Sequence, residues 1–200
     1  MKKIWTLLLC IVMMFSLAAF TGCGQESDES TEDTALEYTI DKQAVTLTIM
    51  SADKEDVVYT AEDLQQMGLT ENTYSGRSKK VQNARQFATY SGVDVNTLLQ
   101  NAGYDTENIV IKVICSDGYT REYDVADDLY GKYTFSDNET DNKTEVIPMI
   151  AVVQADESSE YPAPFKLVYG QEDYDTNDSQ DFNMQGWASY IQCIQVSYDD

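Results

Sequence analysis

The stretch IVIKVICSDGYTREYDV, residues 109–125, decides the fold class. Residues 109–115 are apolar on both faces except for Lys112, which predicts a central β-strand. Residues 116–119 (SDGY) have the composition of a turn, and residues 121–125 are expected to form the partner strand. The stretch therefore predicts a β-hairpin within a larger sheet.

Further strands and short helices are predicted on both sides of this hairpin. A cap at Thr60 and a stop at Gly68 predict one helix, residues 94–102 predict another, and residues 126–130 have the pattern of a short third helix. A strand or hairpin is expected at 38–50, strands at 57–60, 87–90, 148–154, 165–169 and 189–196, and a loop insertion at 127–145. We therefore expect an α+β domain with a mixed β-sheet and two or three short helices.

Residues 1–22 have the layout of a bacterial lipoprotein signal peptide. Two lysines precede an almost wholly apolar run at residues 4–20. The sequence Phe20-Thr-Gly-Cys23 resembles the lipobox, in which the cysteine is lipidated and becomes the new N-terminus, although Phe20 stands where leucine is usual. We expect lipid on Cys23 to hold the protein on the outer face of the bacterial cytoplasmic membrane.

Composition divides the remainder into a tether and a domain. Residues 23–36 are acidic and rich in Ser and Thr, which predicts a disordered tether before a domain at 37–200. The chain has 13 Lys and Arg, two of them in the leader, against 35 Asp and Glu, so the part after the leader carries 11 against 35, or −24. This charge repels phosphate groups and excludes nucleic acid and anionic lipid headgroups as partners of the domain.

The chain has no histidine, which excludes a large part of enzyme chemistry. Serine and cysteine triads that depend on histidine are ruled out, as is the commonest zinc ligand. Of the four cysteines, Cys10 lies in the leader and Cys23 is the expected anchor. Cys115 and Cys193 remain for the domain, either as a disulfide or as two buried thiols.

An acidic loop follows the strand predicted at 165–169. Its oxygen-bearing side chains alternate in the manner of a calcium-binding loop, but Asp178 stands where a glycine is needed and Met184 where a glutamate belongs. A calcium-stabilised adhesion or assembly module and an ordinary solvated loop are both open. The candidate calcium ligands are Asp173, Asp175, Asn177 and Asp181.

Four fragments carry a family resemblance through their shared order. They are YSGV at 90–93, VICSDGY at 113–119, PFKLV at 164–168 and NMQGW at 183–187. Together they resemble the oxidoreductase molybdopterin-binding domain, the family of sulfite oxidase, with Lys166 where arginine is usual. The resemblance implies the fold of that domain over nearly all of the exported part.

The same resemblance implies a cofactor, but its metal ligand has no counterpart. In the enzymes of this family a cysteine ligates molybdenum upstream of the Gly-Val helix, whereas SGRSKKVQNARQF at 75–87 contains no cysteine. Serine or asparagine does not replace a thiolate as a soft ligand. We therefore expect binding of a small ligand or a surface protein without redox catalysis, and keep a molybdopterin-dependent oxidoreductase as the alternative.

The candidate cleft combines aromatic and charged side chains from these fragments. Aromatic rings would stack on a ligand and basic groups would pair with an anion. The simpler interpretation of the basic residues is that they pair with an acidic surface. The candidate ligand-binding residues are Arg77, Arg85, Tyr90, Asp117, Tyr119, Lys166, Asn183 and Trp187.

Overall fold

The computed structural model describes five stretches of the chain. They are residues 36–78, 81–136, 142–154, 160–170 and 187–199, and for 77–78 and 81–85 only the backbone is described. All of them belong to one compact unit, Thr34–Asp200. The predicted signal peptide, Cys23, Asn183 and the four candidate calcium ligands lie outside the described residues.

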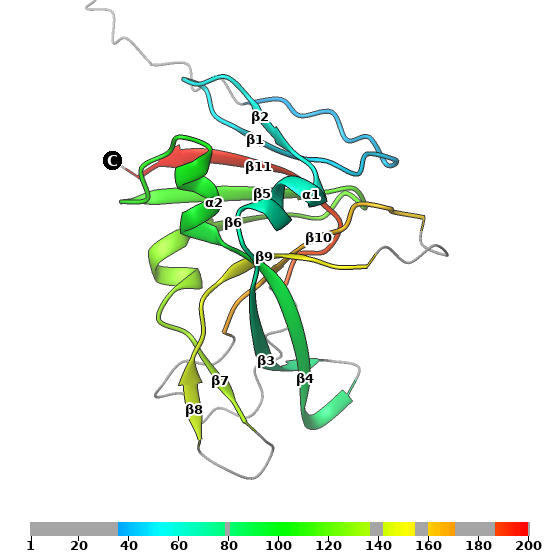
Figure 1. The fold of residues 1–200 in the computed structure, drawn as a ribbon, viewed down its shortest axis with the longest axis vertical. Coiled ribbons are helices and arrows are strands. Elements are labelled where there is room, and N and C mark those ends of the chain that lie inside the picture. Colours follow the sequence, from blue (N-terminus) through cyan, green and yellow to red (C-terminus); the bar gives the residue numbers. More distant parts are fainter. Residues whose placement is uncertain (1–35, 79–80, 137–141, 155–159, 171–186, 200) are drawn as a thin grey trace, which may run out of the picture. The chain divides into compact units, whose positions relative to one another are not determined.

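A five-stranded sheet contains the hairpin that the sequence predicts (Figure 1). In spatial order the strands are β2 (Val57–Tyr59), β1 (Leu47–Met50), β11 (Ile191–Tyr198), β5 (Ile109–Cys115) and β6 (Thr120–Asp124). The strand β5 lies between β11 and β6, so the prediction of a central strand is confirmed. The strands β1 and β11 pair in parallel and the other pairs are antiparallel, which makes the sheet mixed.

A second, four-stranded sheet is antiparallel throughout. Its order is β10 (Phe165–Val168), β9 (Met149–Val152), β4 (Val81–Asp94) and β3 (Thr70–Ser78). The long strands β3 and β4 form an arm that extends away from the five-stranded sheet (Figure 1). A small hairpin, β7 (Tyr133–Phe135) and β8 (Lys143–Glu145), completes the strands of the described residues.

Three short helices connect the strands. Helix α1 (Ala61–Gln66) begins at a capping box, in which the Thr60 hydroxyl accepts a hydrogen bond from the Asp63 amide and the Asp63 carboxylate accepts one from the Thr60 amide. Asp94 caps helix α2 (Val95–Asn101), and η1 (Val125–Leu129) is a π-helical turn. None of the helices in the described part of the chain is long and apolar enough to cross a membrane.

The core lies between the five-stranded sheet and the elements that cover one of its faces. Apolar side chains from that sheet, from both α-helices and from the four-stranded sheet form one buried cluster. Among its fully buried members are Leu47, Leu64, Leu98, Ile111, Phe165 and Leu167. On the opposite face, Leu36 and Tyr38 from the segment before β1 pack on Met50, Ile114 and Cys193.

Gly92 explains why the YSGV fragment contains a glycine. Strand β4 passes β9 closely at this point, with Gly92 opposite Ala151. A β-carbon at residue 92 would lie 2.3 Å from the carbonyl oxygen of Ile150 and 2.6 Å from the α-carbon of Ala151. These contacts are with backbone atoms, which cannot move aside as a flexible side chain would. The close crossing of the two strands therefore requires glycine.

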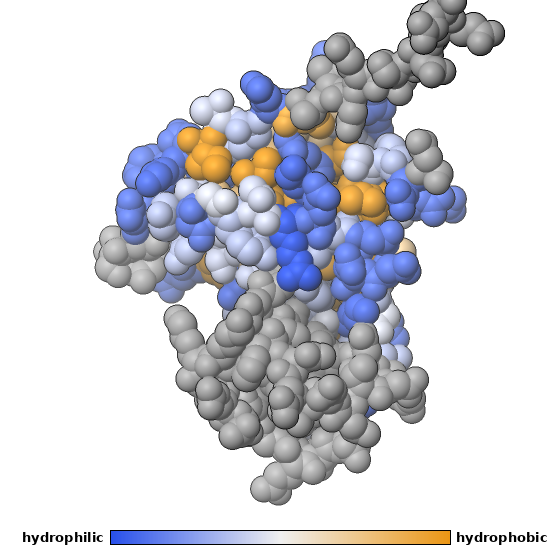
Figure 2. All heavy atoms as spheres, turned by 180° about the vertical axis from the view of Figure 1, so that it is seen from behind, coloured by the Kyte–Doolittle hydropathy of each residue, from blue (hydrophilic) through white to orange (hydrophobic). Residues whose placement is uncertain are grey.

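The surface of the described part mixes polar and apolar groups. On the face shown in Figure 2, small apolar patches are separated by hydrophilic side chains. The most exposed large apolar side chains are Val58 at 56% and Val45 at 53%, and both belong to the region around β1 and β2. Scattered apolar residues of this kind are normal on protein surfaces.

The predicted α+β class with a mixed sheet and three short helices is confirmed, but two segment predictions were wrong. The predicted loop at 127–145 contains β7 and β8, and of the strand or hairpin predicted at 38–50 only Leu47–Met50 is a strand. Polar contacts order the first of these segments, because the Ser75 amide donates to Thr134 Oγ1 at 2.6 Å and the Phe135 amide donates to Ser75 Oγ at 2.8 Å. Such polar pairs leave no apolar periodicity in the sequence.

Candidate functional site

Lys166 lies on β10 with its ammonium group between aromatic rings. Its Nζ donates a hydrogen bond to the Tyr90 hydroxyl oxygen at 3.0 Å. The same nitrogen lies 5.0 Å from the centre of the Tyr90 ring and 5.4 Å from that of Trp187, within the range of cation–π attraction. Among the described residues, no carboxylate lies within ion-pair distance of Lys166, in contrast to Lys42 and Lys112.

A cluster of three aromatic side chains supports this lysine. The ring of Trp187 meets Tyr90 edge to face, with centroids 5.8 Å apart, and meets Tyr74 in the same way at 6.1 Å. Trp187 Nε1 donates to the Tyr169 carbonyl oxygen at 3.0 Å, and the Tyr74 hydroxyl donates to the Ile147 carbonyl oxygen at 2.7 Å. Since these polar groups have partners inside the protein, the rings are fixed in place.

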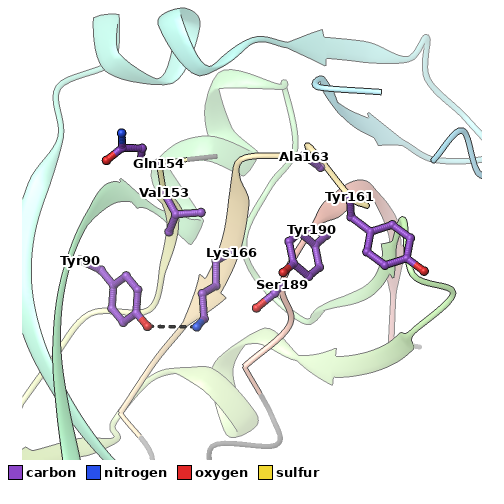
Figure 3. A pocket seen from close by; sticks show the side chains of 8 residues that line it. All are labelled: Tyr90, Val153, Gln154, Tyr161, Ala163, Lys166, Ser189 and Tyr190. Carbon is purple, nitrogen blue, oxygen red and sulfur yellow. Dashed lines mark hydrogen bonds between the residues drawn. The ribbon is translucent and has the colours of Figure 1, made fainter. Parts of the chain in front are cut away.

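An open pocket with a volume of about 260 Å³ lies beside Lys166. In Figure 3, the lysine side chain lies between Tyr90 on one side and Ser189 and Tyr190 on the other. The pocket is built where strand β4, the segments flanking β9 and β10, and the residues before β11 come together. Its lining residues are Tyr90, Val153, Gln154, Tyr161, Ala163, Lys166, Ser189 and Tyr190.

Tyr190 has a left-handed backbone, with φ of 61°. Such a conformation costs a non-glycine residue about 1–3 kcal/mol and persists only where the surroundings impose it. The backbone is held at this point, because the amide and the hydroxyl of Ser116 both donate to the Tyr190 carbonyl oxygen, at 2.9 and 3.2 Å. The Tyr190 ring packs against Tyr161, with centroids 5.5 Å apart. A tyrosine with a strained backbone thus lies in the wall of the pocket.

The structure brings together three of the residues predicted for the cleft, Tyr90, Lys166 and Trp187. The backbones of Arg77 and Arg85 pair with each other in the β3–β4 arm, and Tyr90 lies five residues beyond Arg85 along β4. Five residues of strand span roughly 17 Å. The backbones of the two arginines are therefore well separated from Tyr90.

Asp117 and Tyr119 lie in the turn between β5 and β6. The Asp117 carboxylate accepts a hydrogen bond from the Tyr119 amide at 2.9 Å, which stabilises the turn. Nearby, the Arg121 guanidinium lies over the Tyr123 ring at 5.1 Å, and Tyr123 meets Tyr169 edge to face. Neither Asp117 nor Tyr119 is among the lining residues of the pocket.

Sequence reasoning missed most of the pocket wall. Val153, Gln154 and Ala163 belong to connecting segments with no distinctive motif, and Ser189 lies within the predicted final strand. Tyr161 and Tyr190 could not be singled out from the sequence, because the chain has 14 tyrosines. The positive φ of Tyr190 could not be inferred from its residue type, because tyrosine rarely adopts that conformation.

The described residues do not fit the molybdenum centre that the family resemblance implies. Such a centre requires a thiolate at an accessible cleft. Cys115 and Cys193 are both fully buried, and burial raises the pKa of each thiol to about 12. Within the described stretches, no group of three His, Cys, Asp or Glu side chains is arranged to hold a metal ion.

Comparisons with known proteins give a fold likeness only. No protein-family model and no curated protein matches the chain. Among solved structures, the sulfane dehydrogenase SoxCD from Paracoccus pantotrophus is similar over 82% of this chain, with 17% sequence identity and a TM-score of 0.49. This chain covers 40% of that protein's chain. At this level of similarity the comparison assigns no substrate, cofactor or residue role.

Proposed function

We propose that this chain is an extracytoplasmic lipoprotein, anchored through Cys23, whose domain binds a small ligand in the pocket beside Lys166. The observation that carries the proposal is the pocket itself, with a half-buried lysine that has no acidic partner among the described residues. A concave site with apolar walls and a few converging polar groups is the usual form of a small-molecule site. The strained Tyr190 in its wall supports a role beyond packing.

Binding without redox catalysis agrees best with the side chains. The molybdopterin-binding-like ancestry that the sequence fragments suggest would account for a cleft at this place. The accessible thiolate that molybdenum chemistry needs is not supplied by Cys115 or Cys193, both of which are fully buried. We therefore propose a domain of this type that uses its cleft for another ligand.

Native mass spectrometry of the protein purified from its own host tests the proposal. The wild-type chain is expected to retain a small ligand, and Ser189→Phe, which fills the pocket, is expected to lose it. The matched control is Ser197→Phe, because Ser197 is exposed on the last strand and lies outside the pocket lining. Equal ligand content in wild type and Ser189→Phe would argue against the pocket as the site.

The competing proposal is a molybdopterin-dependent oxidoreductase. It predicts molybdenum at about one atom per chain in protein purified from host cells grown with molybdate. Metal analysis of the same preparation decides between the two. A stoichiometric molybdenum content would overturn the proposal of a non-redox binding domain.

A further inference from the structure

Within the part of the chain that the structure describes, the ammonium group of Lys166 has one hydrogen-bond partner. A lysine ammonium carries three donors. One donates to the Tyr90 hydroxyl at 3.0 Å, and the described residues supply no carboxylate for the others. The rings of Tyr90 and Trp187 attract the charge but accept no strong hydrogen bond. An acceptor supplied by a ligand would complete the coordination of this group.

The charge of the surroundings favours a ligand with a single negative charge. Lys166 is the one cation among the described residues that line the pocket. Lys42, which lies 5.8 Å from the centre of the Tyr161 ring, is paired with Glu160 at 3.7 Å. Among the described residues, no carboxylate balances the charge of Lys166, so a ligand with one negative charge would match it. A second negative charge on the ligand would be repelled by a chain with a net charge of −22.

The rest of the pocket suits a flat ring. Tyr161 and Tyr190 form a pair of aromatic side chains on one side, and Val153 and Ala163 add apolar surface. A cavity of about 150 Å³ holds benzene. The volume of about 260 Å³ found here leaves room for such a ring and a short polar group that reaches Lys166.

We infer that the pocket takes a small aromatic monocarboxylate, with its carboxylate on Lys166 Nζ and its ring against Tyr161 and Tyr190. This inference rests on the proposed function and specifies the chemical class of the ligand. The carboxylate gains a charge-assisted hydrogen bond in a partly desolvated site, which is stronger than a bond between neutral groups. Figure 3 shows the side chains that would hold the two parts of the ligand.

Calorimetric titration of the full lipidated chain in a non-ionic detergent tests the charge requirement. Benzoate and 4-hydroxybenzoate are the probes, and benzamide is the neutral match. We expect benzoate to bind and benzamide to bind at least about tenfold more weakly. Lys166→Met is expected to weaken benzoate binding by a similar factor. Lys112→Met, which removes a lysine paired with Glu122 on another strand, is expected to leave the affinity unchanged.

Two further comparisons test the other parts of the inference. Lys166→Arg keeps the positive charge and is expected to restore most of the affinity that Lys166→Met loses, which separates a charge effect from misfolding. Cyclohexanecarboxylate and phenyl phosphate are expected to bind more weakly than benzoate, because one lacks a flat ring and the other carries extra charge. Thermal unfolding of each variant establishes that it is folded.

The outcomes separate this inference from the proposed function. Equal binding of benzoate and benzamide, or unchanged benzoate binding by Lys166→Met, overturns the anion assignment, and equal binding of cyclohexanecarboxylate overturns the ring assignment. If no carboxylate binds while native mass spectrometry finds a neutral ligand that Ser189→Phe loses, the inference fails and the proposed function stands. If neither method finds a ligand, both fail.

Discussion

Cys115 and Cys193 lie on neighbouring strands of the five-stranded sheet but pack on opposite faces of it. Cys115 belongs to the main core cluster, whereas Cys193 packs with Met50 and Ile114 beneath the segment that precedes β1. A disulfide needs two β-carbons that point towards each other. Side chains on opposite faces of a sheet cannot meet this requirement without a change in the backbone.

We therefore expect both cysteines to remain free thiols in the folded protein, including under oxidising conditions. Burial raises the pKa of each thiol to about 12, so almost no reactive thiolate exists near neutral pH. Alkylation of the native protein is expected to leave both residues unlabelled, and alkylation after unfolding is expected to label both. A digest peptide in which Cys115 is linked to Cys193 would contradict the prediction.

Trp187→Phe is expected to destabilise the domain. The substitution removes the donor to the Tyr169 carbonyl oxygen, a bond of 3.0 Å in a buried setting. The loss of a typical intramolecular hydrogen bond costs about 0.5–1.5 kcal/mol. Urea unfolding measures the loss, and Tyr198→Phe, at an exposed position near the C-terminus, serves as the control with little expected effect. Equal stability of Trp187→Phe and wild type would show that the bond contributes nothing.

Gly92→Ala is expected to loosen the crossing of β4 and β9. The added methyl group would meet backbone atoms of Ile150 and Ala151, so the strands must separate. Overpacking of this kind costs about 1–3 kcal/mol, and a rigid backbone neighbour favours the upper part of that range. Thermal unfolding checks the result, with Ser91→Ala on the same strand as the control. If Gly92→Ala were as stable as wild type, the two strands would have room for a β-carbon at this position.

The strongest strand and both capped α-helices could be predicted because local sequence determines them. The run at 109–115 is apolar on both faces and became β5, and the Thr60 and Asp63 pair marks the start of α1 as the capping rules require. Of the arm formed by β3 and β4, only residues 87–90 were predicted as a strand, because the arm presents polar residues to solvent. The Thr73 and Thr89 hydroxyls bond across it at 2.8 Å, a contact that leaves no apolar pattern.

The candidate site was predictable only in part, for the same reason. Tyr90, Lys166 and Trp187 were identified because they fall in fragments with a family resemblance. Tyr161 and Tyr190 meet through long-range packing, since the residues between them include the whole of β10. Spatial proximity of this kind depends on the tertiary fold and has no local signal.

The capping box of α1 predicts a specific pH dependence. Hydrogen bonds from the amide and the hydroxyl of Thr60 lower the pKa of the Asp63 carboxyl below 3.8. A group whose pKa is lower in the folded state contributes stability above its unfolded pKa, and this contribution disappears as the pH falls through the folded value. Asp63→Asn is therefore expected to lower the melting temperature at pH 7.

The difference between wild type and Asp63→Asn is expected to shrink as the pH falls below about 4. Glu62→Gln removes a charge from the same helical turn without removing the cap and serves as the control. Melting curves at a series of pH values measure both variants. A difference that stays constant down to the most acidic pH at which the domain is folded would exclude Asp63 as its source.

The last prediction is that lipid on Cys23 anchors the protein to the membrane. Lipidation occurs on the sulfur of the lipobox cysteine, so Cys23→Ser is expected to abolish incorporation of labelled fatty acid in the native host. Cys10→Ser is the matched control, because Cys10 lies in the apolar run and is expected to be removed with the leader. Mass spectrometry of the wild-type N-terminal peptide is expected to begin at Cys23 and to carry acyl groups. An unmodified N-terminus at another residue would show that the leader is cleaved as an ordinary signal peptide. The anchoring part of the proposed function would then be wrong. Ligand binding in the pocket would still be decided by its own tests.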